Sequence, residues 1–162
     1  MRITKWRSMP DLSPQVRSEK TWWRLIHTAE AGSHHWAAPA IAKHISKSFE
    51  SISVGDVPAR TDLKVVAGRG LSCIVDDVSV VIGNEQHLRA EGIRSRLLQE
   101  HIQTLDELES CVLVAFDGEY AGMLAFADQI AHGAAESIAQ LKADGLGVCM
   151  VCFMVVASPT LL

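Results

Sequence analysis

The feature that most constrains the fold is a turn signal between two apolar segments. "CVLVAF" ends at Phe116, "AGMLAFA" begins at Ala121, and the tetrapeptide "DGEY" lies between them. Its Asp117-Gly118 pair favours the tight turns with positive φ that join antiparallel strands. These residues predict a β-hairpin and, with it, an antiparallel sheet.

Three further segments have the composition of strands. "LSCIVDDVSVVIG" predicts two strands around Asp76-Asp77, although that turn lacks the preferred glycine. "DLKVV" predicts a short strand after a loop over 51–61, which contains Gly55 and Pro58. The apolar run "VCMVCFMVV" predicts one more strand near the end of the chain.

Helices are expected before and between these strands. In "EKTWWRLIHTAEAG" the apolar positions share one helical face: Trp22, Trp23, Leu25, Ile26 and Ala29. A second helix is expected over 39–49, shorter ones at "EQHLRAEGI" and "SRLLQEHIQTLDEL", and a last one at "GAAESIAQLKADG". This order predicts an α+β domain, an antiparallel sheet flanked by helices. The last helix and strand predict the beginning of a second, α/β unit.

Composition excludes several classes of protein. Of the 162 residues, 48% are hydrophobic and 21% are charged, which is typical of a folded domain. The net charge of -4 argues against nonspecific nucleic-acid binding. No apolar run approaches the ~20 residues that a membrane helix needs, so we expect no membrane span and a cytoplasmic chain.

Metal binding has one candidate pair. Cys149 and Cys152 form a C-x-x-C and, with Met150 and Met154, offer soft ligands suited to Cu(I). However, residues three apart on a strand point to opposite faces. The adjacent His34 and His35 are also poor metal ligands, because neighbouring side chains on a helix diverge by ~100°. We therefore expect no structural metal, with Cys149 and Cys152 as the weak candidates.

Two polar motifs allow either a structural or a binding interpretation. Gly68 and Gly70 in "VVAGRGLSC" follow a strand, but Cys73 occupies the third glycine position of a dinucleotide fingerprint, so that motif is absent. The glycines form a plain turn or let a ligand approach the backbone. Asn84 is suited to cap a helix. In "EAGSHHWAAPAI", the helix begins at Ser33, which puts His35 in its first turn, or begins only at Pro39.

Four stretches in order resemble the nucleotide-binding domain of heavy-metal P-type ATPases, most closely the copper-transporting branch. They are "AEAGSHHWAAPAI", "GRGLSC", "VIGNEQHL" and "VLVAFDGEYAGMLAFAD", within a resemblance that runs from about residue 22 to 148. It implies a lead-in over 1–18, a nucleotide-binding domain over 19–128, and over 129–162 a partial phosphorylation domain, incomplete and similar to haloacid dehalogenases.

The resemblance also implies an ATP site, with Mg-ATP as the ligand. The residues that match the motifs of the family are Glu30, His35, Gly68, Gly70, Leu71, Gly83 and Asn84. In that family the histidine packs against adenine, the acidic residue reaches the amino edge of the base, the glycines bring the backbone near the purine, and the Gly-Asn pair closes the site. The chain departs from the family at His34, where Glu is usual, and at Trp36, where Pro is usual. Trp36 offers a stacking surface or simply fills the pocket.

The motifs for phosphoryl transfer are missing from these residues. The family phosphorylates the Asp of D-K-T-G-T, and no Asp-Lys pair occurs here. The tail reads "ASPTLL" where T-G-D is expected, and Ala131 and His132 follow Asp128 where a basic residue and Pro are usual. A phosphoryl-transfer enzyme needs its nucleophile and its Mg²⁺ carboxylates. We expect a truncated, non-enzymatic fragment that cannot be phosphorylated or transport ions by itself.

This function implies particular partners. The resemblance predicts an ATP-binding fragment of a copper or heavy-metal translocating P-type ATPase, whose phosphorylation and membrane domains are the partners. In that family the domain faces the cytosol, while the whole pump is membrane-embedded. Two alternatives stay open: a small Cys/Met metal-binding module, and a structural or interaction domain in which His35, Gly68 and Asn84 are only caps and turns.

Overall fold

The computed structural model describes residues 1–9, 12, 16, 18–33, 35–49, 59–106, 109–127 and 132–149. It divides into two compact units, Met1–Gln129 and Ile130–Leu162. The sheet and the helices α1 to α4 belong to the first unit, and α5 (Ala134–Ala143) belongs to the second. The domain boundary expected between 128 and 129 stays a prediction.

The first unit is built on a six-stranded sheet in the order β1-β6-β5-β4-β3-β2. Every neighbouring pair of strands is antiparallel. The strands are β1 (Arg2–Ser8), β2 (Arg60–Val66), β3 (Gly70–Val75), β4 (Val78–Gly83), β5 (Ser110–Phe116) and β6 (Glu119–Ala127). The predicted α+β class with an antiparallel sheet is therefore confirmed.

Both predicted hairpin turns form. Asp117 and Gly118 have φ of 49° and 82°, as the Asp-Gly signal requires. At the β3–β4 turn, Asp76 and Asp77 also have positive φ, 50° and 62°. Aspartate tolerates this conformation better than most residues because its short side chain can bond locally. The turn therefore forms without the glycine that is usually preferred.

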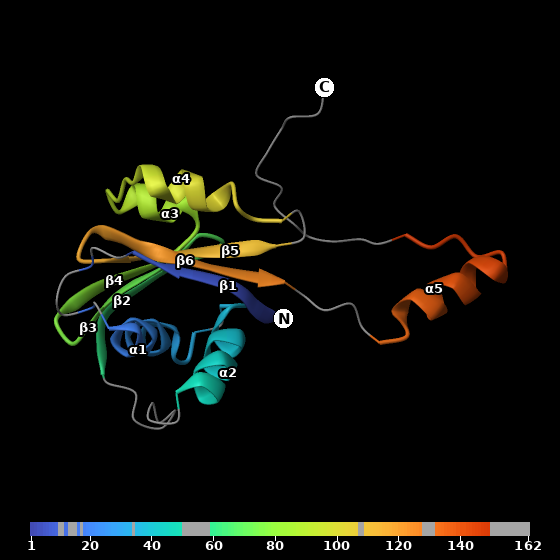
Figure 1. Cartoon of the computed structure of the whole chain (residues 1–162), viewed down its shortest axis with the longest axis horizontal. Helices are drawn as coiled ribbons and strands as arrows, with labels where there is room; N and C mark the ends of the chain where they lie inside the picture. Colours follow the sequence, from blue (N-terminus) through green and yellow to red (C-terminus); the bar gives the residue numbers. More distant parts are fainter. Residues whose placement is uncertain are drawn as a thin grey trace. The chain divides into compact units, whose positions relative to one another are not determined.

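Two pairs of helices cover the two faces of this sheet (Figure 1). Helices α1 (Glu19–Glu30) and α2 (Ala38–Ser48) pack together, with α1 against β3 and β4 and α2 against β1. On the other face, α3 (Glu85–Ala90) packs on β4 and β5, and α4 (Arg96–Ile102) packs on β6. The sheet thus has a hydrophobic cluster on each side.

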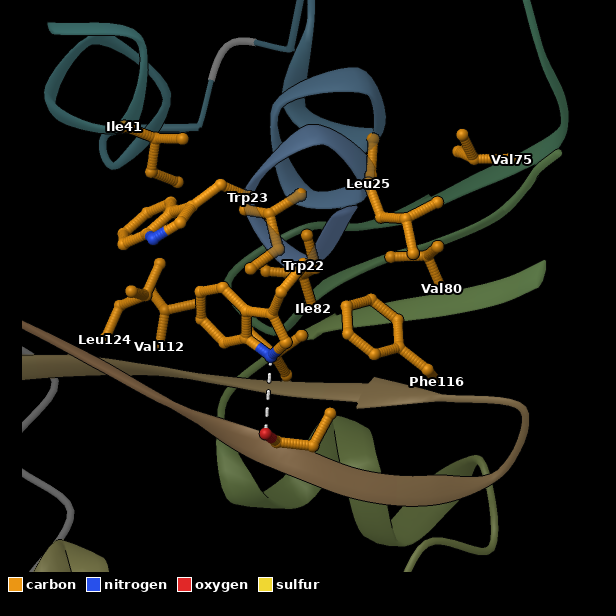
Figure 2. Packing of buried hydrophobic residues seen from close by; sticks show 14 of the residues in the cluster. Trp22, Trp23, Leu25, Ile41, Val75, Val80, Ile82, Val112, Phe116 and Leu124 are labelled. Atoms are coloured by element: carbon orange, nitrogen blue, oxygen red, sulfur yellow. Dashed lines mark hydrogen bonds between the residues drawn. The ribbon is translucent and has the colours of Figure 1, made fainter. Parts of the chain in front are cut away.

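The larger cluster is centred on the tryptophans of α1 (Figure 2). Trp22 has no exposed surface, and its Nε1 donates a 3.3 Å hydrogen bond to the carbonyl of Ala121. Its ring meets Phe116 edge to face at a centroid distance of 6.4 Å and Trp23 at 5.0 Å. A buried indole needs such a partner for its N–H. Trp22 therefore fixes α1 against the sheet both by packing and by a directed bond.

Strand β1 was not expected from the sequence and forms one edge of the sheet. A polar cluster ties it to the residues before β5: Lys5 Nζ bonds Asp106 Oδ2 at 2.8 Å and Glu109 Oε2 at 2.9 Å, and Thr4 Oγ1 donates to Glu109 Oε1 at 2.6 Å. The hydrogen bonds from Thr4 and Lys5 lower the pKa of Glu109 to about 2. Charge-assisted bonds of this kind favour the ionised carboxylate.

Acid is therefore expected to weaken this edge of the sheet. Since the pKa of Glu109 in the fold lies below the ordinary 4.5, its contribution is complete above about pH 4.5 and is lost as the pH falls towards 2. We expect the melting temperature of Glu109→Gln to fall less steeply than that of the wild type between about pH 5 and pH 2. Glu119→Gln is the matched control, because Glu119 begins β6 and Lys5 pairs near the other end of that strand. Parallel slopes for wild type and Glu109→Gln would contradict the assignment.

The second unit contains the predicted helix α5, at Ala134–Ala143. The strand expected at "VCMVCFMVV" falls almost wholly on 150–162, outside the described residues. The partial phosphorylation domain therefore stays a prediction. None of the helices in the described part of the chain combines the length and the apolar character that crossing a membrane requires.

Candidate functional site

A cavity of about 570 Å³ lies in the first unit, and we call it the glycine-loop pocket. It is lined by the end of α1, the turn before α2, the β2–β3 connection, the end of β4 and the start of β5. Every residue assigned to the ATP site by the resemblance lines it: Glu30, His35, Gly68, Gly70, Leu71, Gly83 and Asn84. Its volume is typical of small-molecule sites. The fold thus brings together stretches that lie far apart in the sequence.

The β2–β3 connection is a tight turn that requires Gly68. Arg69 N donates to the Val66 carbonyl at 3.0 Å, and Gly68 has a φ of 71°. This conformation is accessible to glycine without steric cost. A Cβ at Gly68 would meet no atom within 4 Å. Gly68 is therefore needed for the backbone conformation, and the space beside it is open.

Gly70 and Gly83 are required for a different reason. They face each other in the β3–β4 ladder. A Cβ on Gly70 would lie 2.6 Å from the Cα of Gly83 and 2.7 Å from Cδ2 of the His87 ring. A Cβ on Gly83 would also contact this ring, at 2.9 Å. The buried imidazole of His87 occupies the space that the two missing side chains leave, a packing role that the sequence did not reveal.

Asn84 is the N-cap of α3, as predicted. Its Oδ1 accepts a 3.0 Å hydrogen bond from the backbone N–H of His87. Its Nδ2 donates to the carbonyl of Gly68 at 3.1 Å, and its backbone N–H donates to the carbonyl of Arg69 at 2.8 Å. Asn84 therefore joins α3 to the glycine turn, and substitution would disturb both the cap and the pocket wall.

His35 lies in the turn before α2 and not in the helix. The helix begins at Ala38 with Pro39 in its first turn, so a start near Pro39 is confirmed and a start at Ser33 is wrong. The reason is that a proline deep inside the helix would remove a backbone donor, whereas its fixed φ suits the first turn. His34 lies outside the described residues.

Glu30 holds the His35 imidazole. The carboxyl group is 2% exposed, its Oε1 lies 2.8 Å from His35 Nδ1, and its Oε2 accepts from Ser33 Oγ. A carboxylate only accepts hydrogen bonds, so Nδ1 carries the proton. In the neutral ring, Nε2 then keeps a free lone pair. Both oxygens of Glu30 are thus engaged within the protein, and its expected contact with a base stays a prediction.

Several lining residues were not among the expected site residues. Arg69 is the one arginine or lysine among the described residues that line the pocket, and its position between two glycines was visible in the sequence. Val65 and Cys111 also line it, with no sequence signal for that role. Burial raises the pKa of Cys111 to about 11, which keeps the thiol protonated and unreactive. Trp36, which stands where the family usually has Pro, also lines the pocket.

The metal hypothesis gains no support from the described residues. Within them, no group of three His, Cys, Asp or Glu side chains gathers to hold an ion. Cys149 is exposed and free, and Cys152 falls outside the described part of the chain. The C-x-x-C site therefore stays a prediction.

Comparison with known proteins identifies relatives over most of this chain. No protein-family model matches. A copper-exporting P-type ATPase of Staphylococcus haemolyticus is 26% identical over 134 residues, which cover 82% of this chain. A probable copper-exporting P-type ATPase V of Mycobacterium tuberculosis is 31% identical over 145 residues, 86% of this chain. These homologues are copper-exporting P-type ATPases, and a zinc-transporting ATPase of Synechocystis sp. is 30% identical over 129 residues, 80% of this chain.

Solved structures of heavy-metal P-type ATPases show the same fold. The N-domain of HMA6, a copper-transporting P-type ATPase, aligns with a TM-score of 0.56 at 18% identity, over 76% of this chain and 95% of that one. A zinc-transporting PIB-type ATPase in the E2.Pi state aligns with a TM-score of 0.63 at 21% identity, over 90% of this chain and 22% of that one. The first unit therefore has the fold of a P-type ATPase N-domain.

The match to the pumps covers one part of them. This chain spans 16% of the Staphylococcus P-type ATPase and 18% of the Mycobacterium one. The pocket described above lies in the first unit, which has the fold of the N-domain of HMA6.

Proposed function

We propose that the glycine-loop pocket binds ATP and that the chain is the nucleotide-binding part of a copper or heavy-metal translocating P-type ATPase. The observation that carries this proposal is the convergence of all seven motif residues, from three separate stretches, on one cavity of about 570 Å³. A nucleotide needs a site for a flat base and one for phosphates, and the pocket offers both.

The chemistry of the lining suits the two ends of a nucleotide. His35 provides a flat ring that Glu30 holds in one orientation, and an aromatic ring packs well against a purine. The carboxylate cannot donate, so a neutral His35 offers an accepting Nε2 to an amino group. Arg69 provides positive charge for phosphate oxygens, which arginine binds through several N–H groups. Mg²⁺ would arrive with the phosphates as Mg-ATP.

The pump-level activities are proposed with this role. In a complete pump the chain would hold ATP while a phosphorylation domain accepts the γ-phosphate and a membrane domain moves the ion, with this domain on the cytosolic side. The 162 residues contain no Asp-Lys pair, so they lack the nucleophile motif of the family. We therefore expect the chain alone to bind ATP without hydrolysing it or transporting an ion.

An NMR titration of the purified chain with Mg-ATP tests the proposal. Resonances of Glu30, His35, Gly68, Gly70 and Asn84 are expected to shift together, and His35→Ala is expected to weaken binding about 10-fold, because base–aromatic stacking contributes ~1–3 kcal/mol. The method suits weak affinity, since millimolar binding amounts to only ~4 kcal/mol.

A matched control removes a histidine elsewhere. His132→Ala changes an imidazole in the second unit and is expected to leave the titration unaltered. A well-folded wild-type sample whose resonances do not move at millimolar Mg-ATP would contradict the proposal and favour a domain that binds no nucleotide.

A further inference from the structure

Trp36 differs from the other tryptophans of the chain in its exposure. Trp22 and Trp23 are completely buried, and Trp6 is partly buried against the same core. Trp36 is 43% exposed and lines the glycine-loop pocket. With the exposed Val65 and Val66, which line the same pocket, this indole gives the concave site an apolar surface, a feature of binding sites.

Contacts with buried residues fix the orientation of the Trp36 indole. The ring meets Phe126 of β6 nearly at a right angle, 78°, with centroids 5.0 Å apart, and Phe126 is 1% exposed. The next residue, Ala37, is completely buried, and Ala38 N donates to the His35 carbonyl at 3.1 Å. The ring therefore rests against a buried aromatic ring and on a held backbone, which lowers the entropy cost of using it to bind.

Trp36 and His35 offer two flat surfaces in one pocket. Their ring centroids are 5.2 Å apart with an interplanar angle of 48°, and both side chains line the cavity. His35 is itself oriented by Glu30. A phosphate or a metal ion gains little from an indole face, whereas the π-face of a nucleobase stacks on it. The pair thus suits an aromatic base.

We propose that Trp36 is a binding residue of the pocket, which stacks on the purine of the bound nucleotide and makes affinity depend on the presence of an aromatic base. This inference rests on the proposed ATP-binding function. Because stacking is tolerant of base identity, Trp36 selects for an aromatic base as such, and Arg69 accounts for the phosphate end. Adenosine, which lacks phosphates, should therefore still contact Trp36.

The test follows the indole N–H signals of the four tryptophans during titrations with Mg-ATP, adenosine and inorganic tripolyphosphate. The Trp36 signal is assigned by its loss in Trp36→Leu. We expect this signal to shift with ATP and adenosine but not with tripolyphosphate. Trp36→Leu should weaken ATP and adenosine about 10-fold and leave tripolyphosphate binding unchanged, while Trp36→Phe should restore most of the affinity.

The outcomes separate this inference from the function on which it rests. If ATP shifts the pocket resonances and Trp36→Leu binds it as tightly as the wild type, the stacking role is wrong and nucleotide binding stands. If the wild type binds neither ATP nor adenosine, both proposals fail. Equal losses for ATP and tripolyphosphate in a folded Trp36→Leu would also overturn the inference, since they would place the effect at the phosphates. Thermal unfolding of both variants shows that the fold is intact.

Discussion

Trp22→Ala is expected to lower the free energy of unfolding by about 3–5 kcal/mol, the range measured for removing a large buried aromatic ring. Trp22 has no exposed surface and lies between α1 and the sheet, in contact with Trp23 and Phe116. Its loss leaves a cavity under α1 and removes the hydrogen bond to the Ala121 carbonyl, which keeps its 3.0 Å bond from Met9 N. Denaturant unfolding measures the change, which corresponds to a fall of about 10–20 °C in melting temperature.

Trp22→Phe separates packing from the hydrogen bond. It keeps an aromatic ring against Phe116 but removes the N–H that bonds Ala121, so a smaller loss of about 1–2 kcal/mol is expected. A loss below about 1 kcal/mol for Trp22→Ala would show that the site collapses around the missing ring and that Trp22 does not hold α1 in place.

Gly70→Ala is expected to have the second-largest effect, a loss of about 3 kcal/mol or more, at the upper end of overpacking costs. The added Cβ would lie 2.6 Å from the Cα of Gly83, so the β3–β4 ladder must separate at the pocket. We expect lower stability, measured by denaturant unfolding, together with shifts of the amide resonances of β3 and β4.

Two further variants identify the cause of this effect. In Gly70→Ala with His87→Ala the ring is gone but the backbone of β4 remains, so the double variant should recover little stability. Gly68→Ala adds a methyl group where no atom lies within 4 Å and should cost only the strain of positive φ, about 1 kcal/mol. Full recovery in the double variant would assign the restriction to His87 alone.

The elements predicted from the sequence are those whose conformation is determined by residues close by in the sequence. Asp117-Gly118 sets its turn wherever the hairpin lies in the sheet, and the apolar face of α1 reads directly from its periodicity. Strand β1 was not predicted, because its polar-rich sequence forms a strand only through pairing with β6. The bonds of Lys5 to Asp106 and Glu109 also hold it in place. Such pairing depends on residues far along the chain, which local patterns do not record.

The site, too, was predicted only in part. The resemblance identified residues that the fold collects in one pocket, but it assigned the glycines to ligand approach. The structure gives Gly70 and Gly83 a packing reason, the close approach of the β3 and β4 backbones and of the His87 ring. It also engages Glu30 with Ser33 and His35. These contacts depend on side chains from other elements, so no spacing in the sequence reveals them. The ligand roles themselves await the titrations.

The position of β1 at the edge of the sheet also has a consequence for how the domain is made. Arg2 pairs with Ala127, so β1 can pair only with a segment that lies far along the chain. Until β6 has emerged and folded, Ile3 and Trp6 have no sheet to cover. Closing so long a loop costs entropy before any contact repays it, which slows folding. Strand β1, whose one neighbour in the sheet is β6, can therefore join the sheet only after β6 is in place.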